Sequence, residues 1–161
     1  MEVTTDNLMV GDLLMFKGYS GEYLYSKVKC IDSRSGKIVL DNRWVDNEQM
    51  EYIPIDRDIL KRLGFTFSWD ENLSLRLFDG DVVEIFFEDD TWNVRIHSKY
   101  EHKSVKSPIK YFHEIQHGLR LLKLDYISDE LVSQLIGHTE LDNSEFDYGH
   151  DVKYDSGYED S

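Results

Sequence analysis

The first 55 residues alternate between short apolar runs and turn residues. Four of the runs have the length and partial alternation of β-strands: Leu13 to Phe16, Tyr23 to Asp32, Lys37 to Asp41 and Met50 to Ile55. No helical pattern lies between these runs. We therefore expect residues 1–55 to form a small, strongly bent antiparallel β-barrel.

A short helix is expected directly after this segment, from Asp56 to Gly64. Acidic residues occupy its first turn and basic residues its last, which suits the helix dipole. Gly64 stands where the C-terminal end of a helix favours glycine. The apolar side of this helix consists of Ile59, Leu60 and Leu63.

Strict alternation of apolar and polar residues follows over three further segments. This period of two predicts a three-stranded meander with one buried face and one wet face. On the wet face, Phe86 points outward beside Glu84, Glu88 and Arg95. The alternating apolar positions are Leu73, Leu75, Leu77, Val83, Ile85, Phe87, Trp92, Val94 and Ile96.

The period becomes helical near Ser107–Pro108, although residues 109–111 could instead complete the sheet. One face of this helix carries Phe112, Ile115, Leu119 and Leu122, which we expect to pack against Leu75, Ile85, Val94 and Ile96. A last short helix is expected from Ser128 to Gly137. The middle segment, residues 56–137, thus combines a helix, a β-meander and C-terminal helices, and the whole chain has the α+β pattern.

Charge is concentrated at the C-terminal end. The chain has 18 Lys and Arg against 32 Asp and Glu, a formal net charge of −14. Residues 139–161 hold eight acids and one base, half of that charge, but almost no aliphatic residues. Neither the helical nor the strand period appears there. We expect residues 138–161 to form a flexible acidic tail.

Composition also narrows the class of protein. No apolar run is long enough to span a membrane, and the N-terminus lacks the pattern of a signal peptide. The acidic balance disfavours direct nucleic-acid binding, which needs Lys and Arg. The single cysteine, Cys30, excludes an internal disulfide and is expected to be a small buried apolar residue. These features favour a soluble globular protein of the cytoplasm.

One motif could carry chemistry. His113-Glu114-Ile115-Gln116-His117 has the H-E-x-x-H pattern on an expected helix. This spacing places two imidazoles one turn apart, where they could bind zinc with Glu114 as general base. The alternative function is therefore a zinc metallopeptidase, with Glu140 as the only well-spaced third ligand.

Other positions disfavour that alternative. The extended motif requires Gly and His where Arg120 and Lys123 stand. The favoured interpretation places His113 and His117 on a polar helix face beside Arg120, with Glu114 exposed. We therefore favour no catalytic residue, no metal ligand and no cofactor.

The acidic tail is the expected partner-binding segment. Its carboxylates and aromatic rings suit a protein partner with a basic surface. A second alternative is an acidic DNA mimic that inhibits a nucleic-acid-binding protein of the host, and a third is a tail that only adds solubility. The candidate binding residues are Phe146, Asp147, Tyr148, Tyr154, Asp155 and Tyr158.

Three blocks resemble a family of small uncharacterised proteins of gut Bacteroidales and their phages and prophages. They are Asn7 to Asp12, the strand–helix–Gly–Phe centre from Tyr52 to Phe65, and Lys110 to Leu122 with its H-E-I-Q-H sequence. The resemblance implies an accessory protein of a mobile element with no assigned activity and no catalytic residues. Relatives can carry Gln at position 114 and Asn at position 117, which does not fit shared zinc chemistry. We therefore expect a non-enzymatic phage or prophage accessory or virion-associated protein that binds another protein.

Overall fold

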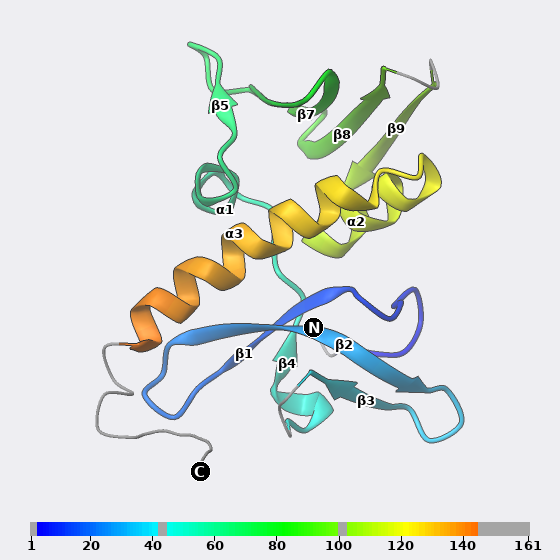
Figure 1. Cartoon of the computed structure of the whole chain (residues 1–161), viewed down its shortest axis with the longest axis vertical. Coiled ribbons are helices and arrows are strands. Elements are labelled where there is room, and N and C mark those ends of the chain that lie inside the picture. Colours follow the sequence, from blue (N-terminus) through cyan, green and yellow to red (C-terminus); the bar gives the residue numbers. More distant parts are fainter. Residues whose placement is uncertain (1–2, 42–44, 100–102, 145–161) are drawn as a thin grey trace.

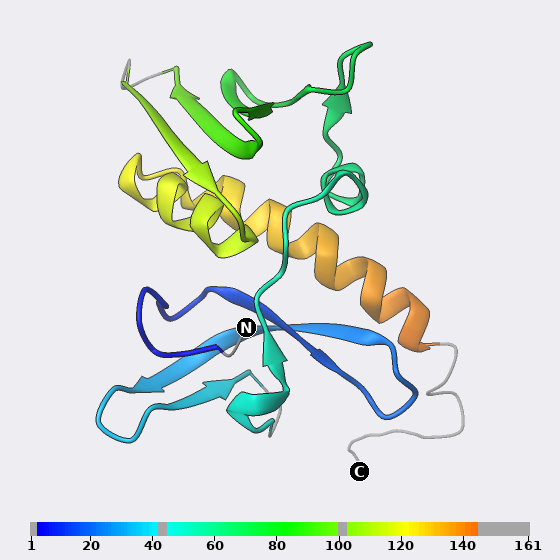
Figure 2. The same ribbon diagram turned by 180° about the vertical axis from the view of Figure 1, so that it is seen from behind.

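Two antiparallel sheets enclose a pair of helices (Figure 1). The computed structural model describes residues 3–41, 45–99 and 103–144, the side chains of Lys103 and of residues 138–144 excepted. Helices α2 (Phe112–Leu121) and α3 (Asp125–Ser144) run between the two sheets, and Figure 2 shows the same order of layers from behind. The expected α+β class is confirmed.

The N-terminal sheet is open rather than closed. Its strand order is β3-β2-β1-β4, with β1 (Leu13–Lys17), β2 (Tyr23–Asp32), β3 (Lys37–Leu40) and β4 (Met50–Glu51). The four expected strands are present, but β3 and β4 lie at opposite edges, so the described chain does not close a barrel. The short helix η1 (Asn47–Gln49) follows the loop after β3, and its Asn47 Oδ1 accepts a bond from the Ile38 backbone N–H at 3.2 Å.

The C-terminal sheet has five strands where the alternation predicted three. Its order is β5-β6-β7-β8-β9, and each strand is antiparallel to its neighbours. The sequence pattern missed β5 and β9 because one is only two residues long and the other is rich in lysine and serine. The strands are β5 (Thr66–Phe67), β6 (Leu73–Phe78), β7 (Asp81–Glu88), β8 (Thr91–Ser98) and β9 (Lys103–Ile109).

Helix α2 packs against both sheets. Its buried residues Phe112, Ile115 and Leu119 belong to the larger core, together with Ile85 and Ile96 of the C-terminal sheet. Gly118 makes the approach to β8 close, because a Cβ atom there would lie 3.0 Å from Ile96 Cδ1. The expected burial of this helix face is confirmed.

Strand β1 separates two apolar cores. Leu13 faces the larger core, which contains α2 and α3, whereas Leu14 and Phe16 face a smaller core within the N-terminal half. Successive strand residues point to opposite sides, so one strand can serve both cores. The buried residues of α3 in the larger core are Ile127, Leu131, Val132 and Leu135.

The expected orientation of β6 is wrong. Ser74 and Phe78 are buried on the core face, and Leu73, Leu75 and Leu77 are exposed on the outer face. The register pairs Ser74 with Ile85 and Leu75 with Glu84, so the neighbouring strand sets which face β6 presents. A period of two identifies two faces, but it does not say which of them is covered.

Three further expectations about boundaries and burial are corrected. Strand β9 extends through Ile109 and α2 begins at Phe112, so the helix does not start at Ser107. Helix α3 does not end at Gly137 but continues to Ser144, which is seven residues into the expected tail. Cys30 is exposed beside a β-bulge rather than buried. The expected helix after Asp56 is confirmed as α1 (Arg57–Arg62), with Asp56 as its N-cap.

Candidate functional site

The H-E-I-Q-H motif lies where the two halves of the molecule meet. The segment from Met9 to Leu13 runs beside the second half of α2, and three polar side chains of the helix bind it. These side chains belong to Gln116, His117 and Arg120, spaced so that they project from one side of the helix. We call this set, together with Asp12, the polar clamp.

Gln116 continues the hydrogen bonding of β1 with its side-chain amide. Its Oε1 accepts a bond from the Leu13 N–H at 2.9 Å, and its Nε2 donates to the Gly11 carbonyl at 3.2 Å. Nε2 also lies 3.2 Å from the Ser128 hydroxyl oxygen on α3. Because Gln116 is buried, these partners satisfy polar atoms that water does not reach.

Asp12 is the charged centre of the clamp. The residue is fully buried, and its Oδ2 lies 2.7 Å from His117 Nε2, while Oδ1 accepts a bond from Arg120 at 3.1 Å. The Met9 N–H donates to Oδ2 at 2.8 Å. A carboxylate that is shielded from water needs several hydrogen-bonding or charged partners, because an unpaired buried charge is strongly destabilising.

Arg120 also fixes the backbone before Asp12. It donates to the Val10 carbonyl at 3.1 Å, and a Cβ atom at Gly11 would lie 3.0 Å from its Nη2. Gly11 has φ of +95°, a conformation that L side chains rarely adopt. Glycine is therefore required at position 11 both by the backbone and by the guanidinium beside it.

Glu114 is half-buried and serves the start of α2. Its Oε1 accepts bonds from the Lys110 and Tyr111 N–H groups at 2.7 and 2.9 Å, which is the arrangement of a capping box. The expectation that Glu114 is simply exposed is therefore wrong. Its carboxylate accepts hydrogen bonds from backbone N–H groups at the N-terminal end of α2.

His113 is buried instead of lying on a polar helix face. The residue is 5 % exposed, and its ring stacks on Tyr52 with centroids 5.0 Å apart. Its Nδ1 has no hydrogen-bond partner among the described residues. Burial lowers the pKa of His113, and the nearby Asp12 carboxylate opposes that shift only in part.

The motif as folded does not fit a zinc site. The Arg120 guanidinium lies against Asp12, and His117 Nε2 already faces the same carboxylate. Glu114 is held at the N-terminus of α2 by the bonds that it accepts from the Lys110 and Tyr111 N–H groups. Across the described side chains, no three His, Cys, Asp or Glu groups are placed to hold a metal ion, and the side chain of Glu140 lies outside them.

A second surface lies on the outer face of the C-terminal sheet. Leu73, Leu75 and Leu77 are 38, 36 and 67 % exposed, and the register places Phe86 opposite Leu73. We call these four residues the outer apolar row. Beside the outer apolar row, Arg95 lies over the Phe86 ring and forms an ion pair with Glu84 at 3.0 Å. The sequence pattern placed these three residues together on the wet face.

The expected partner-binding residues of the tail, from Phe146 to Tyr158, lie outside the described residues. Sequence reasoning missed the roles of Asp12, Gln116 and Arg120. One signal was available: an acidic residue directly before an apolar strand needs a compensating partner if that strand is buried. The pattern could not say where in the chain that partner stands.

Comparison with known proteins adds no further assignment: no family model, curated protein or solved structure matches the chain. The resemblance stated from the sequence therefore stays a prediction. None of the described helices combines the length and apolar character needed to cross a membrane.

Proposed function

We propose that this chain is a non-enzymatic protein that binds another protein. The observation that carries the proposal is the outer apolar row, which exposes three leucines side by side on one sheet face. Contiguous exposed apolar residues with a polar rim are typical of protein interaction sites. Three polar residues of the H-E-I-Q-H motif support the same conclusion, since Glu114, Gln116 and His117 form hydrogen bonds within the fold.

The proposed partner combines an apolar contact with a basic surface. Leu77, the most exposed of the row, offers an anchor that a partner could bury. A formal net charge of −14 favours association with basic proteins and opposes association of two copies of this chain. We propose that the acidic tail adds electrostatic attraction to the contact that the leucines make.

The biological setting is part of the proposal. The resemblance to proteins of gut Bacteroidales and their phages suggests an accessory protein in the cytoplasm of a bacterial host or on a virion. The partner would then be a host or phage protein.

The experiment compares two exposed leucines. Leu77→Asp places a charge in the outer apolar row, whereas Leu121→Asp does so at a residue of α2 that is 75 % exposed. A partner captured from the host and then purified should bind the Leu77→Asp variant at least about tenfold more weakly, as expected for an anchor residue. It should bind the Leu121→Asp variant and the wild type equally well.

Equal binding of the Leu77→Asp variant and the wild type would refute the role of the outer apolar row. Competition by duplex DNA for the same partner would instead favour the acidic DNA mimic. Thermal unfolding of both variants provides the control that each is folded.

A further inference from the structure

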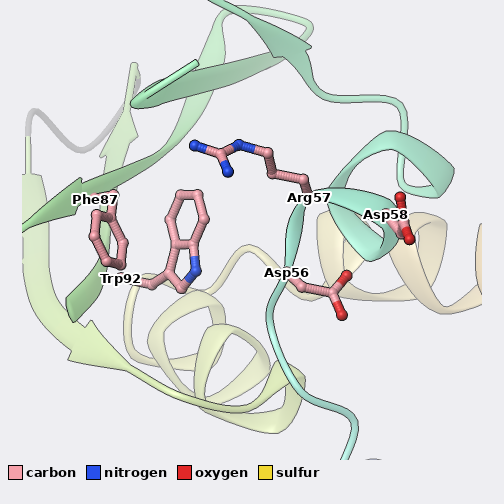
Figure 3. A pocket seen from close by; sticks show the side chains of 5 residues that line it. All are labelled: Asp56, Arg57, Asp58, Phe87 and Trp92. Atoms are coloured by element: carbon pink, nitrogen blue, oxygen red, sulfur yellow. The ribbon is translucent and has the colours of Figure 1, made fainter. Parts of the chain in front are cut away.

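A pocket of about 380 Å³ lies between the start of α1 and the β7–β8 hairpin. This is the end of the C-terminal sheet where the core face meets solvent, away from the outer apolar row. Figure 3 shows the Trp92 indole between Phe87 and α1, with Arg57 extending from the helix toward the sheet. The lining residues are Asp56, Arg57, Asp58, Phe87 and Trp92.

The sheet side of the pocket is aromatic. The rings of Phe87 and Trp92 lie edge to face, with centroids 5.1 Å apart and planes at 67°. Phe87 is 40 % exposed, although it continues the core face of β7 on which Val83 and Ile85 are buried. Indole and phenyl faces carry negative electrostatic potential, so they attract a cation placed against them.

The helix side of the pocket carries excess negative charge. Arg57 is already engaged with Glu71, donating to its carbonyl oxygen at 3.1 Å and lying 3.5 Å from its carboxylate. Asp56 uses Oδ1 to accept the Ile59 N–H at 2.8 Å, and no ion pair offsets its charge among the described residues. Asp58 lines the pocket and is exposed. With Arg57 compensated by Glu71, the two aspartates leave the pocket acidic.

We infer that this pocket binds a cationic group on an aliphatic stem, namely a lysine or arginine side chain of the protein partner. The stem would lie against Phe87 and Trp92, and the cation would face the carboxylates of Asp56 and Asp58. This assignment rests on the proposed protein-binding function for the source of the side chain. An anionic ligand would meet two aspartates and an arginine whose charge is already paired.

The size of the pocket agrees with this class of ligand. Its volume lies within the range of sites that enclose a small molecule, about 300–1,000 Å³. The pocket is open to solvent, so a side chain projecting from another protein could enter without rearrangement of the sheet.

The experiment uses capped amino acids as probes, which separates the pocket from the unidentified partner. We would titrate the full chain with N-acetyl-lysine N-methylamide and with the arginine analogue, and follow the indole N–H signals by NMR. Trp92→Phe identifies the Trp92 signal. That signal should shift with both cationic probes and much less with the uncharged norleucine analogue, and added salt should reduce the shift.

Asp58→Asn tests the negative charge on the helix side of the pocket. The side chain of Asp58 forms no hydrogen bond with the other described residues, so the fold should be unaffected. The apparent affinity for the lysine probe should fall by about two- to fivefold, the range for one exposed ionic contact. Asp129→Asn is the matched control, because Asp129 is an exposed acid in the first turns of α3. This variant should bind like the wild type.

Three results would overturn the inference: no probe shifts the Trp92 signal, the norleucine analogue binds as well as the lysine probe, or N-acetyl-glutamate binds better than either. Failure of the proposed function has a different signature. In that case Leu77→Asp leaves partner binding unchanged, while the Trp92 signal still responds to the cationic probes.

Discussion

Asp12 and His117 are 105 residues apart in the chain, and their side chains meet with Oδ2 and Nε2 separated by 2.7 Å. This contact joins the segment that leads into β1 to the middle of α2. It therefore ties the N-terminal sheet to the helix that packs on the C-terminal sheet. Each polar residue of the H-E-I-Q-H motif except His113 has a hydrogen-bond partner within the fold.

Asp12→Asn should destabilise the protein by about 2–4 kcal/mol. The amide would place an NH₂ group among the donors of Met9, His117 and Arg120, and the charge that compensates Arg120 would be lost. The expected cost lies slightly below that of breaking a fully buried pair, because Arg120 and His117 are each 25 % exposed. Urea unfolding measures the effect, and Asp6→Asn in the exposed segment before it is the control. Equal stability of the two variants would contradict the polar clamp.

His113→Phe should stabilise the protein and reduce its sensitivity to acid. Phenylalanine keeps the stacking on Tyr52 and removes a buried nitrogen that lacks a partner, a gain of about 1 kcal/mol at pH 7. The His113 ring also packs edge-on against His117 and lies near the Asp12 carboxylate.

The pH dependence follows from the direction of the His113 pKa shift. Burial lowers the pKa of His113 in the folded state, so the unfolded chain takes up a proton first as pH falls through about 6.5. The contribution of His113 to stability is thus complete above that pH, declines below it, and levels off below the folded pKa. The stability difference between His113→Phe and wild type should widen from pH 7.5 to 5.5.

Leu119→Ala and Leu77→Ala should differ widely in stability, although both delete the same atoms. Leu119 is fully buried in the larger core, where its loss should cost about 2–5 kcal/mol. Leu77 belongs to the outer apolar row, and its replacement should change the free energy of unfolding by at most about 0.5 kcal/mol. Chemical denaturation of both variants checks this difference. A large loss in Leu77→Ala would mean that the outer face is covered by the protein's own chain.

Ending the chain after Ser144 should leave its melting temperature unchanged. The described cores contain no residue beyond Ile136, and α3 stays complete. Ending the chain after Gln134 should lower the melting temperature, because it deletes the buried Leu135. The variant that ends after Ser144 should also associate more slowly with a basic partner, and its association rate should depend less on salt than that of the full chain. Unchanged association would limit the tail to a solubilising role.

Local patterns in the sequence determined much of the secondary structure. Strand β2 has the predicted bounds, β6, β7 and β8 follow the period of two, and Asp56 and Gly64 flank α1 as their residue types indicate. The apolar face of α2 was also predictable, because a period of 3.6 residues points all its members to one side. These features depend on residues close together in the chain, and the chemistry of those residues suffices to specify them.

Tertiary structure alone decided which faces are covered and which polar residues meet. Alternation along β6 is equally consistent with leucines inside or outside, and the register with β7 and the packing of α2 and α3 resolved it. The H-E-I-Q-H spacing is compatible with a metal site or with a structural role, and it gave no sign that Asp12 and Arg120 meet across most of the chain. A residue's neighbours in sequence set its backbone conformation, but its electrostatic surroundings depend on segments that only folding brings together.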